Sequence, residues 1–120
     1  MKHRWHPLAE AEYDEAVDYY LLHADPVVGR HFVTVVNSAL ELLSTHPAIG
    51  AHMHNEARRI SLHGFPFDLV YRLNRENILI IALANQYRRP GHWARRRQVD
   101  FKPVSAVARR AMLVSSTATS

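Results

Sequence analysis

A group of arginine, histidine and tryptophan side chains suited to anion binding, proton transfer and stacking lies between residues 58 and 97. Its members are Arg58, Arg59, Arg72, Arg88, Arg89, Arg95, Arg96, Arg97, His92 and Trp93. Arginine binds phosphate and carboxylate groups because its guanidinium is planar, permanently charged and bidentate. Histidine can transfer a proton near neutral pH, and tryptophan can stack on a base or anchor a protein contact.

The residues alone leave two interpretations of this group open. A metal-free ribonuclease needs a base for the 2′-hydroxyl, an acid for the leaving oxygen and cations on the phosphate, and the group contains such residue types. In the alternative, Trp93 packs over the edge of a sheet and the arginines are solvated. The residue types by themselves do not decide between these interpretations.

The charge is distributed unevenly along the chain. Residues 1–50 contain three basic and seven acidic side chains, whereas residues 51–120 contain twelve basic and four acidic ones. The two halves therefore carry net charges of −4 and +8, which sum to the +4 of the whole chain. The C-terminal half is thus the expected contact for nucleic acid or for an acidic protein segment, unless it is simply a solvated basic surface.

Several functional classes find no support in the sequence. It contains no cysteine, which excludes disulfides and thiolate chemistry and is typical of a reducing cytoplasm. It has no apolar run of about 18 residues, and its N-terminal region becomes acidic where a secretory signal is apolar, so we expect a cytoplasmic protein without membrane contact. His52 and His54 have no third ligand at a usual metal spacing, and no glycine-rich phosphate loop is present, so we expect no metal or other cofactor.

Proline and capping signals predict two consecutive helices. Pro7 suits the first turn of a helix over residues 7–23, whose early turns are rich in acidic side chains. Asp25 and Pro26 begin a second helix at once, and His46–Pro47 ends it because the residue before proline is disfavoured in helical backbone. The short link between them predicts an antiparallel helical hairpin.

A period of two in the second half predicts a sheet. After a loop over residues 48–56, apolar residues alternate from Arg59 onward, and five large ones share one face of a strand over residues 65–73. Residues 78–84 are apolar on both faces, which indicates a central strand covered on both sides. With a short first strand over residues 2–6, the order is β-α-α-β-β-β, an α+β domain in which the helical hairpin packs on a small antiparallel sheet.

This single domain is expected to span residues 1–97, since the chain length and its apolar content suit one core. Residues 98–120 form a C-terminal tail with different composition. The tail is expected to contain a short amphipathic helix over residues 103–114, followed by a disordered end.

Taken in order, the motifs of this domain resemble the ParE/RelE superfamily of toxins from type II toxin–antitoxin systems. The matching positions are Ala9, Glu12, Ala16, Tyr20, Gly29, Phe32, Ala39, Leu40, Leu43, His46, Pro47, Gly50, Arg59, Leu62, Phe65, Pro66, Phe67, Val70, Tyr71, Arg72, Ile81, Ala82, Leu83, Arg88, Arg89, Pro90 and Trp93. The resemblance extends over about residues 5–97. It implies the fold predicted above and a small toxin that a cognate antitoxin neutralises in a hetero-oligomer.

Two activities occur in this superfamily. RelE-like members cut mRNA in the ribosomal A site, whereas ParE-like members poison DNA gyrase and are not known to use an active site for it. The segments FPFDLVYR and RRPGHW are closer to ParE and to plasmid stabilisation toxins. Asp68 stands where RelE-type nucleases place an arginine, and Trp93 stands where they tend to have a tyrosine. Since a carboxylate would repel the scissile phosphate, the resemblance favours gyrase inhibition and growth arrest.

The resemblance also assigns candidate sites. In a ParE-like protein the gyrase contact would involve Arg58, Arg59, Arg88, Arg89, Trp93, Arg95 and Arg96. In a RelE-like ribonuclease acting on ribosome-bound mRNA, His92 would be the acid or base, while Arg72 and Arg89 would hold the phosphate. A third interpretation is an inactive toxin-like protein that only binds its antitoxin. In each case we expect the antitoxin to cover the basic group with an acidic or amphipathic segment along the sheet edge or the helical hairpin.

Overall fold

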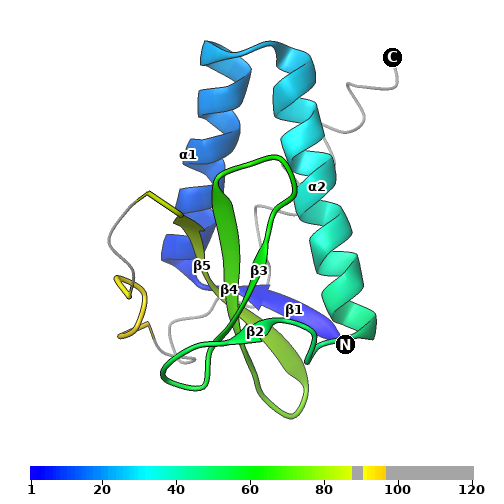
Figure 1. Cartoon of the computed structure of the whole chain (residues 1–120), viewed down its shortest axis with the longest axis vertical. Coiled ribbons are helices and arrows are strands. Elements are labelled where there is room, and N and C mark those ends of the chain that lie inside the picture. The colour runs from blue at the N-terminus through cyan, green and yellow to red at the C-terminus, as the bar shows by residue number, and fades with distance from the viewer. Residues whose placement is uncertain (88–90, 97–120) are drawn as a thin grey trace.

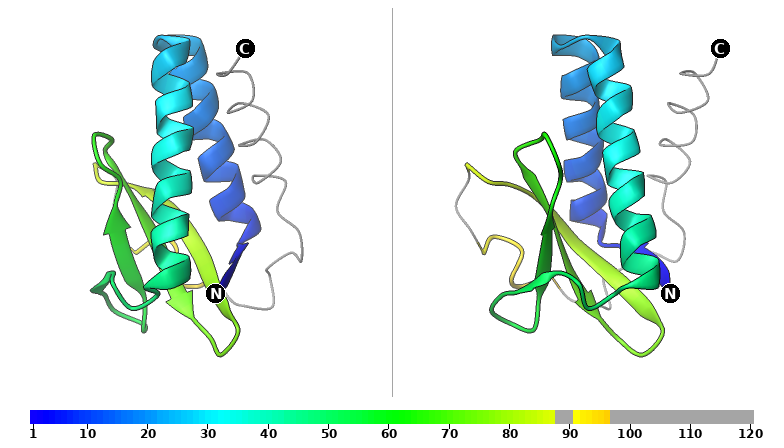
Figure 2. Two further views of the ribbon diagram at one scale, coloured as in Figure 1. Left: turned by 90° about the vertical axis from the view of Figure 1, so that its right-hand side faces the viewer. Right: turned by 45° about the vertical axis from the view of Figure 1, so that its right-hand side comes forward.

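The computed structural model describes residues 1–87 and 91–96 of the 120-residue chain (Figure 1). Two helices form a hairpin, and Figure 2 shows both of them on the same side of a five-stranded sheet. This α+β arrangement confirms the predicted fold class. The helix and the disordered end predicted for the tail lie outside the described residues.

Both helices begin and end at the signals seen in the sequence. Helix α1 (Pro7–His23) follows His6, whose side chain accepts a backbone hydrogen bond from the first turn at 3.1 Å. Helix α2 (Pro26–Thr45) follows Asp25, whose carboxylate accepts an equivalent bond at 2.8 Å. Each helix has proline at its start, where the missing N–H has no helical partner to lose. Helix α2 stops at Thr45 because Pro47 disfavours helical backbone at the residue before it. The predicted bounds of both helices are confirmed.

The sheet is mixed rather than entirely antiparallel. Its strands are β1 (Lys2–Trp5), β2 (Ala51–His52), β3 (Arg58–Ser61), β4 (Phe67–Leu73) and β5 (Asn77–Asn85). They lie in the order β1-β5-β4-β3-β2. Strand β1 pairs with β5 in parallel, whereas the other neighbouring strands pair antiparallel. This corrects the antiparallel sheet predicted above, and the correction arises because the first and last strands, distant in the sequence, become neighbours.

Strand β2 is an addition to the predicted order, since residues 48–56 were expected to form a loop. Two residues are too few to display an alternating pattern, so only their pairing with β3 reveals the strand. The loop before it is anchored by Tyr71, whose hydroxyl accepts a hydrogen bond from Gly50 N at 2.9 Å and donates one to Pro47 O at 2.8 Å. A Cβ atom at Gly50 would lie only 2.5 Å from that hydroxyl oxygen, so glycine permits the close approach.

A bulge in β5 explains its uninterrupted apolar sequence. Val70 pairs with Ala82 and Tyr71 with Ile80, so Ile81 is an extra residue in β5. Ile80 consequently faces the helices, whereas Ile81 and Ala82 both belong to the cluster on the opposite face. Because the bulge places two consecutive residues on one buried face and their neighbour on the other, apolar residues are needed at consecutive positions of β5.

The sheet is covered on both faces. The main core lies between the helices and the sheet and includes the buried aromatic residues Trp5, Tyr13, Phe32 and Tyr71. A smaller second core cluster lies on the opposite face and consists of Ala57, Val70, Leu79, Ile81, Ala82 and Trp93. Strand β5 contributes to both, which confirms the prediction of a central strand covered on both sides.

Candidate functional site

Residues 91–96, which follow β5 in the sequence, lie over the sheet face that the helices leave free. Gly91, at a φ of +88°, provides a backbone conformation that other residues rarely adopt. Trp93 then packs into the second core cluster with Val70 and Leu79 and is only 3% exposed. Burying an indole of this size makes Trp93 the anchor that holds the described residues 91–96 on the sheet.

Arg72 also holds residues 91–96 in place, through hydrogen bonds to their backbone. Its Nη1 donates a hydrogen bond to Arg96 O at 2.9 Å, and its Nη2 reaches Ala94 O at 3.4 Å. Its Nε donates to Asn55 O at 2.9 Å. The guanidinium carbon also lies 6.0 Å from the centroid of the Trp93 ring, at the outer limit of a cation–π contact. Arg72 therefore stabilises the fold of this segment through backbone carbonyls.

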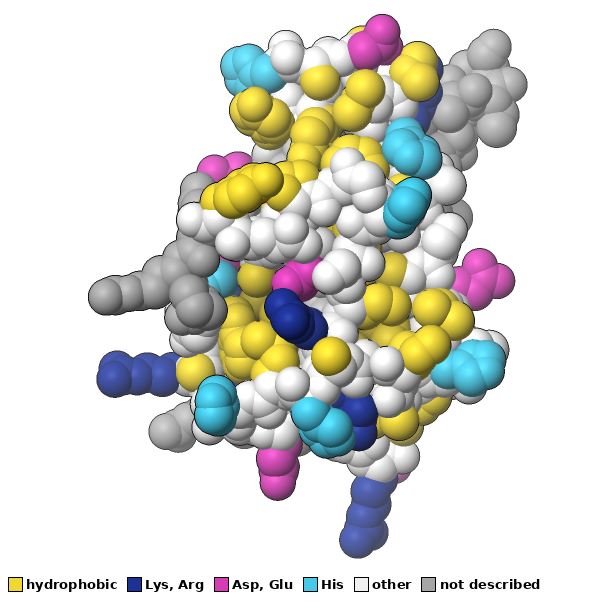
Figure 3. Space-filling view, viewed as in Figure 1, with side chains coloured by type: hydrophobic (Ala, Val, Ile, Leu, Met, Phe, Trp, Pro, Cys, Tyr) yellow, Lys and Arg dark blue, Asp and Glu magenta, His cyan; other side chains and the backbone are white. Residues whose placement is uncertain are grey.

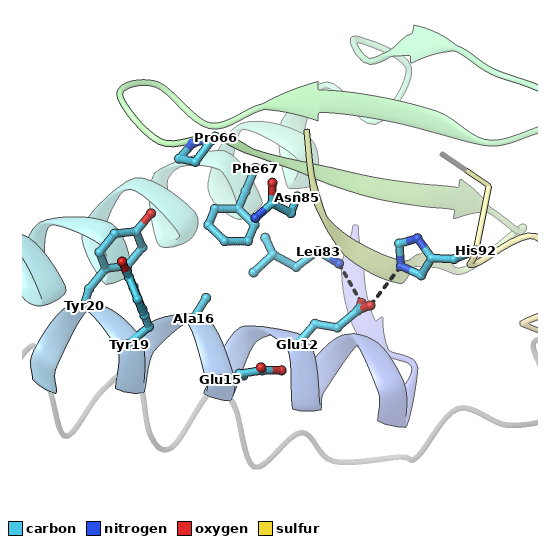
Figure 4. Close-up of a pocket in the computed structure, with 10 residues that line it drawn as sticks. All are labelled: Glu12, Glu15, Ala16, Tyr19, Tyr20, Pro66, Phe67, Leu83, Asn85 and His92. Carbon is cyan, nitrogen blue, oxygen red and sulfur yellow. Dashed lines mark hydrogen bonds and ion pairs between the residues drawn. The ribbon is translucent and has the colours of Figure 1, made fainter. Parts of the chain in front are cut away.

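The carboxylate of Glu12, on α1, is the centre of a polar cluster (Figure 4). Its Oε1 accepts hydrogen bonds from Leu83 N at 3.2 Å and from Arg96 Nη1 at 2.8 Å. Its Oε2 lies 3.1 Å from Arg96 Nη2 and 2.9 Å from His92 Nε2. Arg96 Nη1 donates in addition to Ile81 O at 2.8 Å. The Arg96 and Glu12 side chains are 10% and 25% exposed, so this pair is largely withdrawn from water.

This cluster covers part of the free edge of β5. The parallel pairing of β1 with β5 ends at Trp5 and Ile80, followed by one further hydrogen bond from His6 N to Ile80 O. Beyond that point the carboxylate and the guanidinium take the place of the next strand, because they bind Ile81 O and Leu83 N. Polar side chains from α1 and from the C-terminal segment thus satisfy the backbone groups of Ile81 and Leu83 at an edge that no further strand covers there.

A cleft of about 860 Å³ opens beside this edge, between α1 and the ends of β4 and β5 (Figure 4). It is lined by Glu12, Glu15, Ala16, Tyr19, Tyr20, Pro66, Phe67, Leu83, Asn85 and His92. Burial and the neighbouring Tyr19 raise the pKa of Tyr20, so its hydroxyl remains protonated at neutral pH. The lining residues make the cleft acidic and aromatic, with an apolar wall. The sequence interpretation missed it, although Glu12, Glu15 and Tyr19 recur at helical spacing outside the apolar stripe of α1.

Within residues 1–87 and 91–96, no group of three or more histidine, cysteine, aspartate or glutamate side chains is arranged to hold a metal ion. None of the helices in this part of the chain is long and apolar enough to cross a membrane.

Comparisons with known proteins agree with the resemblance noted in the sequence. Residues 3–90 match the family model of the ParE toxin of the type II toxin–antitoxin system parDE. The chain belongs to the ParE toxin family. Among solved structures, the chromosomal ParDE toxin–antitoxin system of P. aeruginosa matches with 20% sequence identity and a TM-score of 0.60, over 71% of this chain and 95% of that chain. At this identity the structural likeness shows the fold alone. A comparison with curated proteins found no match.

Four of the five described arginines in the predicted group of this ParE-family chain have internal partners. Arg58 Nη1 donates to Ala48 O and Gly50 O, both at 2.9 Å. Arg59 Nη1 lies 3.5 Å from the Asp68 carboxylate, and Arg59 remains 52% exposed. On the face seen in Figure 3, the described Lys and Arg side chains are dispersed and form no continuous basic patch.

Three positions of the predicted group fall outside the described residues, namely Arg88, Arg89 and Arg97. Arg95 is exposed, whereas Arg96 is directed inward to Glu12. Trp93 is buried rather than presented to a partner, so its predicted role as a direct contact is corrected to one of packing on the sheet. The structure therefore brings Arg72, His92, Trp93 and Arg96 together around one segment, but as its supports.

Asp68 is the residue expected, from the sequence resemblance, at the position where RelE-type nucleases have an arginine. Its carboxylate accepts hydrogen bonds from Ser61 Oγ at 2.8 Å and Gln86 Nε2 at 3.0 Å, in addition to the longer contact with Arg59. The Asp68 side chain is 10% exposed. These bonds stabilise a nearly buried negative charge where β3, β4 and the end of β5 meet, and such a charge disfavours a bound phosphate.

Proposed function

We propose that this chain is the toxin of a type II toxin–antitoxin pair, that it acts in the cytoplasm by inhibiting DNA gyrase, and that a cognate antitoxin prevents the resulting growth arrest. The observation that carries the proposal is the match to the ParE toxin family over residues 3–90. The similar P. aeruginosa structure is that of a chromosomal ParDE toxin–antitoxin system, which supports a hetero-oligomer with an antitoxin.

The internal bonds of the candidate catalytic residues support gyrase inhibition over mRNA cleavage. Arg72 donates to three backbone carbonyls, and His92 is paired with Glu12. Both side chains would have to leave these partners before they could hold or protonate a phosphate ester. The carboxylate of Asp68 adds a repulsive charge.

We propose a gyrase-contact surface formed by the arginines that are not withdrawn into the fold. Among the described members of the predicted basic group these are Arg95, which is exposed, and the half-exposed Arg59. Arg88 and Arg89 belong to the same surface in this proposal, on the ground of their position in the sequence between β5 and Trp93. Trp93 supports the surface from within.

The proposal is tested by adding the purified full-length chain to DNA gyrase in a supercoiling assay, with and without ATP, and scoring trapped DNA breaks. We expect inhibition, and we expect the double variant Arg88→Ala/Arg89→Ala or the single variant Arg95→Ala to require about tenfold more protein. The control is Arg75→Ala, which removes an exposed arginine from the turn between β4 and β5. If Arg75→Ala weakens inhibition as much as Arg95→Ala does, the surface assignment is wrong.

An absence of any effect on gyrase from folded protein would overturn the proposal. The mRNA-cleavage alternative would then be tested on translating ribosomes with His92→Gln. Loss of general acid–base catalysis should lower the cleavage rate by about two to four orders of magnitude. A chain that neither inhibits gyrase nor cleaves mRNA nor arrests growth would match the inactive, antitoxin-binding alternative.

A further inference from the structure

We propose that the cleft between α1 and β5 binds an extended segment of a protein partner, and that this segment carries a lysine or arginine flanked by apolar residues. The inference rests on the proposed function in one respect, since it identifies that partner with the antitoxin. Three features of the cleft carry it: an available strand edge, a free negative charge, and aromatic and apolar walls.

The strand edge follows from the hydrogen bonds of β5. Leu83 N points away from β4, because it donates to Glu12 of α1. Backbone groups alternate in direction along a strand, so Asn85 presents its N–H and C=O to the same side. Gln86 N, one residue further, accordingly turns the other way and donates to Pro66 O. Past the Glu12 carboxylate, the outer edge of β5 therefore presents groups that an added strand can bind.

The negative charge is that of Glu15. Glu12 is already paired with the Arg96 guanidinium and in contact with His92 Nε2, whereas Glu15 is exposed one helical turn along and forms no ion pair with a cation in residues 1–87 or 91–96. Tyr19, 58% exposed, lies one turn further on the same helix and also lines the cleft. A cationic side chain would meet the Glu15 carboxylate and could lie against the Tyr19 ring.

The wall opposite α1 is apolar. It is formed by Pro66 and Phe67, with the ring of Tyr20 between the two sides (Figure 4). Apolar side chains that flank the cation in an extended segment would be buried against this wall. The volume of about 860 Å³ is ample for the side chains of a few residues.

The carboxylate of Glu15 selects against other occupants. It would repel the phosphates of a nucleic acid and the carboxylates of an acidic peptide, because no cation among the described residues neutralises it. The segment bound here is therefore basic, whereas the sequence suggested an acidic or amphipathic segment for covering the arginine group. The reversal arises because α1 carries the acidic half of the chain and forms one side of the cleft.

The test uses fluorescent peptides of about ten residues, long enough to pair along an edge strand. One peptide alternates valine and threonine around a central arginine, and its twin has glutamate in place of the arginine. We expect anisotropy measurements on the full-length chain to detect binding of the arginine peptide alone. Glu15→Lys should weaken that binding about tenfold, because an attraction becomes a repulsion. The matched control is Glu41→Lys, which makes the same charge change at an exposed position on α2 and should leave binding unchanged.

A third peptide distinguishes strand addition from simple charge attraction. In this peptide, alternate backbone nitrogens of the arginine sequence are methylated, so that one edge of the peptide has no N–H donors. Binding should be lost when the methylated edge is the one that pairs with β5. Equal binding of the arginine and glutamate peptides, or equal effects of Glu15→Lys and Glu41→Lys, would overturn the inference. So would a dimer that sedimentation detects without peptide and that Glu15→Lys dissociates, because a second copy would then fill the cleft.

This test and the test of the proposed function can fail separately. Peptide binding requires neither gyrase nor growth arrest, so a chain that binds the arginine peptide without inhibiting gyrase would retain the inference and lose the proposed activity. A chain that inhibits gyrase but binds both peptides equally would retain the proposed activity and lose the inference.

Discussion

The pair formed by Glu12 and Arg96 offers the sharpest test of how the fold is held together. It joins the first helix to the segment after the last strand, across 84 residues of sequence. We expect Glu12→Gln to lower the free energy of unfolding by about 2 kcal/mol. Glutamine retains an oxygen for Leu83 N but leaves the Arg96 guanidinium without its counter-ion.

The magnitude follows from the exposure of the two side chains. Exposed ion pairs contribute about 1 kcal/mol or less, whereas breaking a fully buried pair costs about 3–5 kcal/mol because a charge is left unpaired. Arg96 is 10% exposed and Glu12 is 25% exposed, so this pair lies between the two limits. Arg96 would also keep its bond to Ile81 O, which offsets part of the loss.

The assay is urea unfolding of the full-length chain, followed by tryptophan fluorescence, for Glu12→Gln, Arg96→Met and the double variant. A coupling energy of about 1 kcal/mol or more is expected from the cycle, since the two side chains are in contact. The melting temperature should fall by about 8–16 °C for Glu12→Gln in a domain of this size. The control is Glu15→Gln, one turn away and exposed, which should change stability by less than about 0.5 kcal/mol. The ion pair does not hold the C-terminal segment to α1 if Glu12→Gln lowers the free energy of unfolding no more than Glu15→Gln does. The same conclusion follows if the effects of the two single variants simply add in the double variant.

Two further substitutions test the packing that supports the candidate site. Trp93→Ala should destabilise the fold by about 3–5 kcal/mol, since the ring is 3% exposed, whereas Tyr87→Ala at an 86% exposed position should have little effect in the same urea assay. A mild Trp93→Ala would mean that the ring is not a core residue. Gly50→Ala should cost more than Gly64→Ala, because a Cβ at Gly50 would lie 2.5 Å from the Tyr71 hydroxyl, whereas nothing lies within 4 Å of one at Gly64. Only the backbone cost of a φ of +83°, about 1–2 kcal/mol, is expected at Gly64, and a reversed order in the melting temperatures would contradict this.

The helices are the part of the fold that the sequence determines by itself. Their ends depend on Pro7, Asp25–Pro26 and Pro47, and each of these signals acts on backbone within one turn of itself. The apolar residues of β5 likewise indicated a strand covered on both faces before any partner was known. The ordered motifs also sufficed for the family, which the match over residues 3–90 confirms.

The position of the arginines was decided only by the tertiary structure. The sequence shows a dense basic group, and its residue types are those of an anion-binding surface. Their partners, however, lie far away in the chain: Arg96 pairs with Glu12, and Arg72 reaches the carbonyl of Asn55. No local pattern records such pairs, because the pairing of β1 with β5 and the bulge at Ile81 first have to place the groups side by side.

The same reason explains why the cleft was missed and Trp93 misassigned. A tryptophan beside arginines has the same local sequence whether its ring is buried or exposed, and the second core cluster that receives it is assembled from β4, β5 and Ala57. The cleft likewise combines α1 with the far ends of β4 and β5. The sequence therefore shows how many charged and aromatic residues the chain has and where they lie along it. Only the folded structure determines which charges pair with each other and which remain available to a partner, because the paired residues are distant in the sequence.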